Sequence, residues 1–237
     1  SIVPLFTDST RATLSLSVLK GGESFKKVLK SPISFSFSDK LFIETPVVKF
    51  LPSSLAFLIT EIVFLEEYFC RYHISQVSSE QTLKVIKKAK NEGKIFSTGV
   101  SINNLSLNEN DIGDFKTFLK LSPPLRTEKD RTSLIEAIND NYIDVIVSDH
   151  KPEDEESKRL TFAQATTGAI GVETLLPLAL ELFHNKSVKL DKLIATLTSN
   201  PAKILGINKG NLDKGNDADI CVLDINKPWV VKKNELK

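Results

Sequence analysis

Short apolar runs rich in β-branched residues alternate along this chain with segments whose apolar positions recur at helical spacing. The runs that predict strands lie at residues 2–6, 32–37, 72–77, 94–100 and 143–147. The segments that predict helices lie at residues 79–93, 127–141, 172–183 and 190–197, and a short helix is expected from Asn200-Pro201. Strands that alternate with helices in this way indicate parallel β/α units.

Two further stretches have patterns of their own. Residues 51–69 are strongly apolar, but Glu61, Glu66 and Glu67 interrupt them, so a buried or amphipathic helix fits better than a membrane span. Residues 220–223 form an apolar β-run among turn-forming Gly, Asn and Asp. We expect strands here that leave the main sheet instead of another β/α unit.

Five predicted strands are too few for a closed eight-stranded barrel, in which every strand edge must be paired. Either β/α units are missing before this chain, or a partner chain supplies the edge, or the barrel is an open remnant. We favour the first reading, because such a barrel alone takes about 250 residues. The chain has 237 residues and no methionine, even at position 1, which we expect of a processed chain or a fragment.

The composition indicates which classes of partner the chain could bind and in which compartment it acts. With 31 basic and 30 acidic residues the net charge is +1, so there is no electrostatic reason to expect a nucleic acid or a membrane. Cys70 and Cys221 lie far apart in the sequence and form no metal or redox motif, which favours reduced thiols. No signal-peptide pattern opens the sequence. We therefore predict a cytoplasmic protein.

The candidate chemistry lies where the strand at 143–147 ends. Asp149 and His150 follow this strand, an acidic and basic loop comes next, and glycines then lead into an apolar helix. A carboxylate at the carboxyl end of a barrel strand is placed where α/β barrels carry out their chemistry. Asp149 is therefore the leading catalytic candidate.

Several motifs in the chain resemble those of dihydroorotases, which belong to the amidohydrolase superfamily. SDHKPE at 148–153 and GAIGVET at 168–174 resemble the family's TDHAPH and FGIVGLET. YHISQVSSEQTLKVIKKAK at 72–90 and SPPLRTEKDR at 122–131 resemble HISHVSTAETVELIRRAK and NPPLRTEEDR. TSNPAKILGINKGNLDKGNDADICVLD at 198–224 is similar to the family's long closing motif.

The resemblance implies a fold and a chemistry. The fold is α/β, a partial (β/α)8 TIM-type barrel over residues 1–206, with the start of a small C-terminal β-strand segment over residues 207–237. Dihydroorotases interconvert carbamoyl-aspartate and dihydroorotate in pyrimidine synthesis, with zinc that lowers the pKa of bound water to about 7. Asp149 would shuttle the proton, and Thr167 and Gly168 would present backbone groups to the substrate.

Most positions that hold zinc or substrate in the resembled family carry other residues here. Asp8 keeps a carboxylate and could be a remnant ligand, whereas Ser36 and Gln76 stand in place of zinc-binding histidines. The family's His-x-His pair has no counterpart in the chain. Asn103 and Asn104 stand in place of two adjacent histidines of that family. Glu153 stands in place of a substrate-binding histidine, and Ser122 in place of a substrate-binding asparagine.

The three histidines of the chain offer few substitutes. His73 lies three residues before the family's ligand position, and His184 at a helix end is interpreted as solvated or facing the helix dipole. His150 could be a ligand or base, but a structural role is favoured. Zinc prefers imidazole among its ligands, so we expect no metal, although Asp8 and Asp149 could hold a hard cation weakly.

Three hypotheses follow. The favoured one is a non-catalytic dihydroorotase-like subunit that supports aspartate carbamoyltransferase in an oligomer. The alternative is an active dihydroorotase or related cyclic amidohydrolase, which would need a longer parent chain. A decaying relic is the third, and the sequence leaves open whether the chain is an enzyme.

Overall fold

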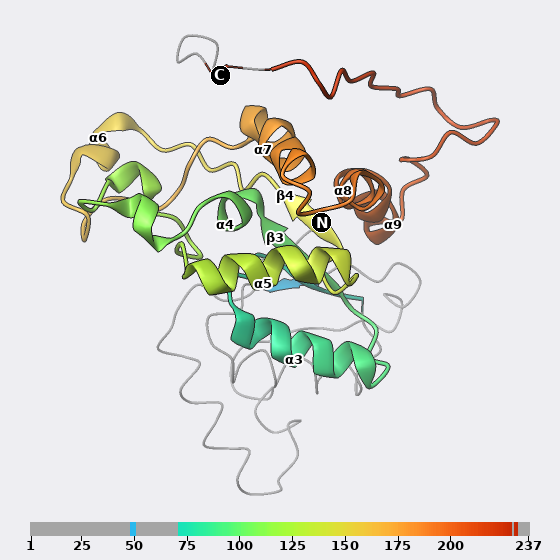
Figure 1. Cartoon of the computed structure of the whole chain (residues 1–237), viewed down its shortest axis with the longest axis horizontal. Coiled ribbons are helices and arrows are strands. Elements are labelled where there is room, and N and C mark those ends of the chain that lie inside the picture. Colours follow the sequence, from blue (N-terminus) through green and yellow to red (C-terminus); the bar gives the residue numbers. More distant parts are fainter. Residues whose placement is uncertain (1–47, 51–70, 229, 232–237) are drawn as a thin grey trace, which may run out of the picture.

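The computed structural model describes residues 48–50, 71–228 and 230–231 (Figure 1). Within these residues four strands form a parallel arrangement in the order β1-β2-β3-β4. The strands are β1 (Val48–Phe50), β2 (Tyr72–Ile74), β3 (Ser97–Ser101) and β4 (Val145–Val147). The order of the strands in space is the same as their order in the chain, so each strand lies beside the strand that follows it, as in the wall of a β/α barrel.

Helices connect and cover the strands. The α-helices are α3 (Glu80–Asn91), α4 (Ile102–Ser106), α5 (Glu128–Asn139), α6 (Glu155–Arg159), α7 (Val172–His184), α8 (Leu190–Leu197) and α9 (Ser199–Leu205). Two short 3-10 turns are η3 (Glu109–Ile112) and η4 (Thr117–Leu119). The helices α3, α5 and α8 pack side by side in that order, and α4 packs against α5 and α7 (Figure 1). No helix in the described part of the chain is both long and apolar enough to span a bilayer.

The core lies between the strands and this helical layer. Its largest fully buried side chains include Ile74, Leu83, Ile86, Val100, Leu134, Ile138, Ile143 and Leu193. Those on one helix are spaced three or four residues apart, so they share a face. Burying one Leu or Ile side chain contributes about 1.5–3 kcal/mol, and the buried face therefore decides how each helix lies on the sheet.

The helix predictions are confirmed with small changes at the ends. Residues 79–93, 127–141, 172–183 and 190–197 correspond to α3, α5, α7 and α8, and α9 contains Asn200-Pro201. The predicted cap is also confirmed, since the Ser79 hydroxyl accepts from the Thr82 N–H at 3.2 Å.

The three described strand predictions are confirmed, but each strand keeps only part of its predicted run, and β3 begins at Ser97 and extends to Ser101. β2 ends at Ile74 because Gln76 takes a left-handed conformation with φ 56°, which no extended strand can contain. The predicted strands at 2–6 and 32–37 and the predicted helix at 51–69 lie outside the described residues, and β1 was not predicted.

The structure corrects two expectations for the loops and the tail. Residues 155–159, part of the acidic and basic loop expected after residues 143–147, form α6, whose first turn is capped by the Asp154 carboxylate accepting from Ser157 N at 2.7 Å. Residues 220–223, expected as a strand, are not assigned one, and Val222 is 91% exposed. No described strand borders this run, and a lone β-run cannot pair its backbone groups.

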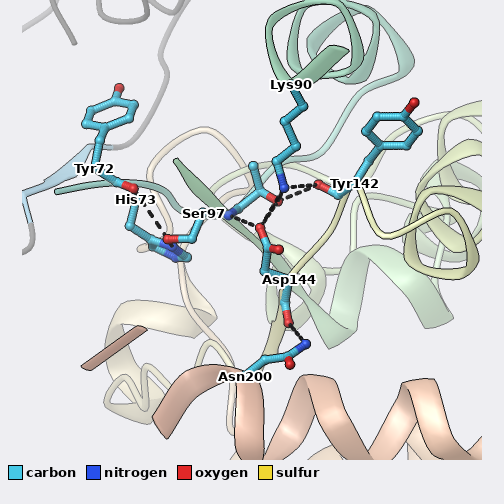
Figure 2. Close-up of polar contacts among 8 residues, drawn as sticks. Tyr72, His73, Lys90, Ser97, Tyr142, Asp144 and Asn200 are labelled. Atoms are coloured by element: carbon cyan, nitrogen blue, oxygen red, sulfur yellow. Dashed lines mark hydrogen bonds and ion pairs between the residues drawn. The ribbon is translucent and has the colours of Figure 1, made fainter. Parts of the chain in front are cut away.

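The amino-terminal ends of β3 and β4 are joined by one carboxylate, that of Asp144 (Figure 2). Its Oδ2 accepts from the Thr98 backbone N–H at 2.7 Å and from Lys90 Nζ of α3 at 2.7 Å. The Asp144 backbone N–H donates to Thr98 O at 3.0 Å, and Asn200 of α9 donates to the Asp144 carbonyl at 2.8 Å. Lys90 also donates to Tyr142 O at 3.2 Å. Asp144 thus connects two strands with two helices.

A second polar cluster begins α5. Thr127 caps the helix by accepting from the Asp130 N–H at 3.2 Å, and Asp130 Oδ1 in turn accepts from the Glu80 N–H at the start of α3 at 2.8 Å. Glu128 accepts from Arg131 Nε at 2.7 Å, and Arg131 also donates to Leu105 O of α4 at 3.0 Å. The TEKDR part of the 122–131 motif is therefore a helix start that joins α3, α4 and α5.

We expect Asp144→Ala to lower the free energy of unfolding by about 2–4 kcal/mol, because the buried Thr98 N–H loses its acceptor and Lys90 loses its anionic partner. Urea denaturation measures the change. The control is Glu92→Ala, which removes an exposed pair with Lys88 at 3.9 Å and should change stability by about 0.5 kcal/mol or less. Equal effects of the two variants would contradict the role given to Asp144.

The second expectation concerns the pKa of Glu128. Hydrogen bonds from Arg131 and then Asn108 lower this pKa from 4.5 to about 2. A lowered pKa stabilises the folded state above the unfolded value of 4.5, and this contribution is lost as the pH falls through about 2. Carboxyl NMR titration should show this midpoint, and Arg131→Gln should raise it towards 4.5. An unchanged midpoint in the variant would contradict the assignment of the cause.

Candidate functional site

The carboxyl ends of β2 and β4 bring together two of the sequence-predicted positions, Gln76 and Asp149. Gln76 Nε2 donates a hydrogen bond to Asp149 Oδ1. Because β3 lies between β2 and β4 in the sheet, this bond reaches across the end of the middle strand. Both residues have left-handed backbone conformations, with φ 56° and 50°. Such conformations cost energy in residues other than glycine and occur often at functional sites.

His150 has a structural role at the start of α7. Its Nδ1 accepts from the backbone N–H of Gly171 at 3.1 Å and of Val172 at 3.3 Å. A ring nitrogen that accepts hydrogen bonds carries no proton and binds no metal. Gly171 is required here, since a Cβ would lie 2.3 Å from Ser148 O. This geometry supports the structural reading of His150.

Thr167 and Gly168 have backbone groups that are already bonded within the chain. Lys151 Nζ donates to Thr167 O at 2.9 Å, and Lys158 Nζ donates to Gly168 O at 2.6 Å. The Gly168 N–H donates to Lys120 O at 3.0 Å. Gly168 has φ 148°, and a Cβ would lie 2.4 Å from Lys151 O. The groups expected to face a substrate therefore contact lysines of the same protein.

The sequence reasoning missed these lysines. Lys158 donates to Thr117 O, Thr166 O and Gly168 O. Burial lowers the pKa of Lys158, the Glu153 carboxylate opposes this, and repulsion from Lys151 and Lys120 adds to it. Lys120 donates to the carbonyls of Ala163 and Ala165 at 3.0 and 2.6 Å. A charged run in a loop is usually solvated, so its pattern carried no signal for this role.

Glu153 does not bring an unbalanced negative charge to the site. Its carboxylate lies 3.0 Å from Lys151 Nζ, and the Glu153 side chain is largely buried. This neighbouring cation of the same loop reduces the repulsion that the Glu153 carboxylate would exert on an anionic substrate.

Two further histidines lie in separate settings. His73 Nδ1 is 2.8 Å from Ser97 Oγ, and the Ser97 hydroxyl is 3.3 Å from Tyr72 O (Figure 2). The His73 ring covers Gly99, where a Cβ would lie 3.0 Å from Nε2. His184 Nε2 lies 2.8 Å from the carbonyl oxygen of Ile225 near the end of α7. These contacts place both histidines in local packing.

The amides at the end of β3 are buried. Asn104 Nδ2 donates to Pro124 O at 3.2 Å, and the Asn103 Nδ2 has no hydrogen-bond partner in the described structure. Ser122 precedes a cis bond to Pro123. Asp8 and Ser36 lie outside the described residues.

The described residues do not fit zinc. No group of three His, Cys, Asp or Glu side chains in the described part of the chain could hold a metal ion. At the family's histidine position, Gln76 directs an N–H towards Asp149, and an amide N–H is a donor that cannot ligate a cation. The Asp149 oxygen therefore meets a hydrogen-bond donor of the protein.

A large cavity lies at the opposite end of the strands. Its volume is about 1130 Å³, and residues before β2 and β3 and residues of α8 and α9 line it, including Arg71, Lys94, Ile95, Asp191, Lys192 and Lys203. Barrel enzymes carry their chemistry at the carboxyl ends, so this cavity is separate from the candidate site.

Comparison with known proteins agrees with the motifs. The sequence model of the amidohydrolase family matches residues 43–236. A dihydroorotase of Ehrlichia canis (strain Jake) is 42% identical over 160 residues, which are 68% of this chain and 36% of the relative. A dihydroorotase of Acetivibrio thermocellus is 35% identical over 193 residues, 80% of this chain and 45% of the relative. The chain thus spans less than half the length of these curated relatives.

Solved structures show the same fold. L-hydantoinase (dihydropyrimidinase) from Arthrobacter aurescens matches with a TM-score of 0.64 and 29% identity, over 68% of this chain and 37% of that one. Dihydropyrimidinase from Brevibacillus agri matches with a TM-score of 0.63 and 21% identity over the same 68% and 37%, which supports the fold alone. The α/β fold with a parallel sheet, of the TIM-barrel superfamily, is confirmed. With its family model covering residues 43–236, this chain belongs to the amidohydrolase family.

Proposed function

We propose that this chain is a non-catalytic, dihydroorotase-like subunit of pyrimidine biosynthesis that supports aspartate carbamoyltransferase. The observation that carries the proposal is the hydrogen bond from Gln76 to Asp149. It joins the proton-shuttle position of the resembled family, Asp149, to a position at which that family carries a histidine, and the group that Gln76 directs at Asp149 is a hydrogen-bond donor. The similarity to relatives named dihydroorotase supports the part of the proposal that concerns pyrimidine biosynthesis.

The other candidate positions support the same proposal. The backbone carbonyls of Thr167 and Gly168 accept from lysines, and His150 Nδ1 accepts from the start of α7. A substrate would have to displace these bonds, of which those to Gly168 O and to His150 Nδ1 are partly buried. We therefore propose a protein that needs no cofactor, acts in the cytoplasm and forms an oligomer with its partner.

An active dihydroorotase or related cyclic amidohydrolase is the second candidate. Two observations favour it: the 42% identity to a dihydroorotase, and the retention of Asp149 in a left-handed conformation at a strand end. This candidate needs metal ligands from outside the described residues. A relic without metal or partner is the remaining alternative.

The first test measures zinc content and dihydroorotate hydrolysis on one preparation of the full chain. We expect neither zinc above background nor turnover, because no group of three His, Cys, Asp or Glu side chains in the described part of the chain could hold a metal ion. The dihydroorotase of Acetivibrio thermocellus, prepared in parallel, serves as the positive control. About one zinc per chain with turnover would establish the second candidate instead.

The second test mixes the chain with aspartate carbamoyltransferase from the same organism. We expect the two proteins to co-elute in size-exclusion chromatography and the carbamoyltransferase to gain thermal stability. A partner at 100 times Kd stabilises the protein it binds by about 2.7 kcal/mol. Separate elution with an unchanged melting temperature, in a sample that also lacks metal and turnover, would identify the chain as a relic.

A further inference from the structure

Two loops at the carboxyl ends of β3 and β4 expose large apolar side chains. Phe115 is 69% exposed, Phe118 61% and Leu160 48%, and Phe162 lies beside them half-buried. We call Phe115, Phe118, Leu160 and Phe162 the apolar patch. Clustered exposed apolar side chains mark interaction sites more often than scattered ones do, and aromatic residues are enriched in interfaces.

The apolar patch is continuous because its two segments contact each other. The rings of Phe115 and Phe162 meet edge to face, with centroids 5.4 Å apart. Thr117 of η4 is joined to Lys158 of α6 by hydrogen bonds in both directions. The patch therefore belongs to one lobe, formed by residues 109–120 and 153–162 (Figure 1).

This lobe is held in a defined shape by its lysines. The ammonium groups of Lys120 and Lys158 are directed onto backbone carbonyls of residues 163–168 and of Thr117. Two of the cations of the lobe, Lys120 and Lys158, are therefore engaged in hydrogen bonds within the chain. A preformed surface loses less conformational freedom when it binds, which favours affinity.

The lobe that carries the apolar patch is rich in exposed acidic side chains. Six exposed carboxylates lie in the described segments 109–114 and 154–156: Glu109, Asp111, Asp114, Asp154, Glu155 and Glu156. The exposed cations of the lobe are Lys116 and Arg159, and Arg159 is paired with Glu155 at 2.7 Å. These six carboxylates, which we call the acidic rim of the lobe, outnumber its exposed cations, although the whole chain has a net charge of +1.

The negative charge of the rim indicates which kind of partner the apolar patch could bind. A second copy docked on the same patch by two-fold symmetry would place one acidic rim against another, which is unfavourable. A folded partner with apolar pockets and a basic rim is complementary instead. We infer that the apolar patch is the surface through which this chain binds a protein partner with a basic rim, and that in the proposed function this partner is aspartate carbamoyltransferase.

The inference rests on the proposed function and adds where the partner binds. Since the lobe follows the carboxyl ends of β3 and β4, a partner seated there lies on the same end of the sheet as Gln76 and Asp149. The chain would thus use the end at which barrel enzymes carry out catalysis as a binding face.

The test compares variants of the full chain for binding to aspartate carbamoyltransferase by surface plasmon resonance. Phe115→Ser/Phe118→Ser/Leu160→Ser removes exposed apolar side chains and should weaken binding about tenfold or more. Asp114→Lys/Glu156→Lys should slow association by about threefold or more at low salt, and high salt should remove the difference.

The matched control is Ile95→Ser, which replaces an apolar residue that is 91% exposed in the cavity at the amino ends of the strands. Circular dichroism verifies that each variant is folded.

The possible outcomes distinguish failure of this inference from failure of the proposed function. Binding by the wild type and by Ile95→Ser, with loss in the triple variant, supports the inference. Binding by the wild type with equal affinity in the triple variant overturns the inference and leaves the proposed function standing. A dimer of the chain alone that the triple variant dissociates also overturns it, because the occupant is then a second copy. No binding by the wild type overturns the proposed function itself.

Discussion

The register of β3 against β4, together with the Asp144 carboxylate that bonds to Thr98, determines the rest of the structure. Gly99 pairs with Val145 and Ser101 with Val147. Because side chains alternate along a strand, this register turns Thr98 and Asp144 towards Lys90 of α3, and it turns Gly99 towards the ring of His73. A shift by one residue would exchange these faces.

The carboxyl end of the same strands shows how a barrel site can be filled by the protein itself. The Asp149 carboxylate accepts from an amide, His150 accepts from the start of a helix, and the carbonyls of Thr167 and Gly168 accept from ammonium groups. Each of these groups has its hydrogen-bond partner within the same chain, although His150 is exposed and Asp149 is only partly buried.

The loops that close this site also carry the apolar patch. Lys120 and Lys158 bond to carbonyls on the inside of the lobe, while Phe115 and Phe118 lie exposed on its outside. A loop bonded in this way keeps its exposed side chains in place. The contacts of these two lysines thus bond the candidate site and the lobe that carries the apolar patch to each other.

The sequence by itself determined most of the helices, the family and the residue types at the candidate site. Helical spacing identified α3, α5, α7 and α8, and the residue types at positions 76, 103 and 104 excluded the histidines that zinc prefers. These properties are local, so a pattern along the chain can reveal them. The bridge from Gln76 to Asp149, the lysine contacts of Gly168 and the unpaired state of residues 220–223 depended on the tertiary structure. They are decided by which segments meet in space, and side chains 73 residues apart meet only because the parallel strands place their carboxyl ends together.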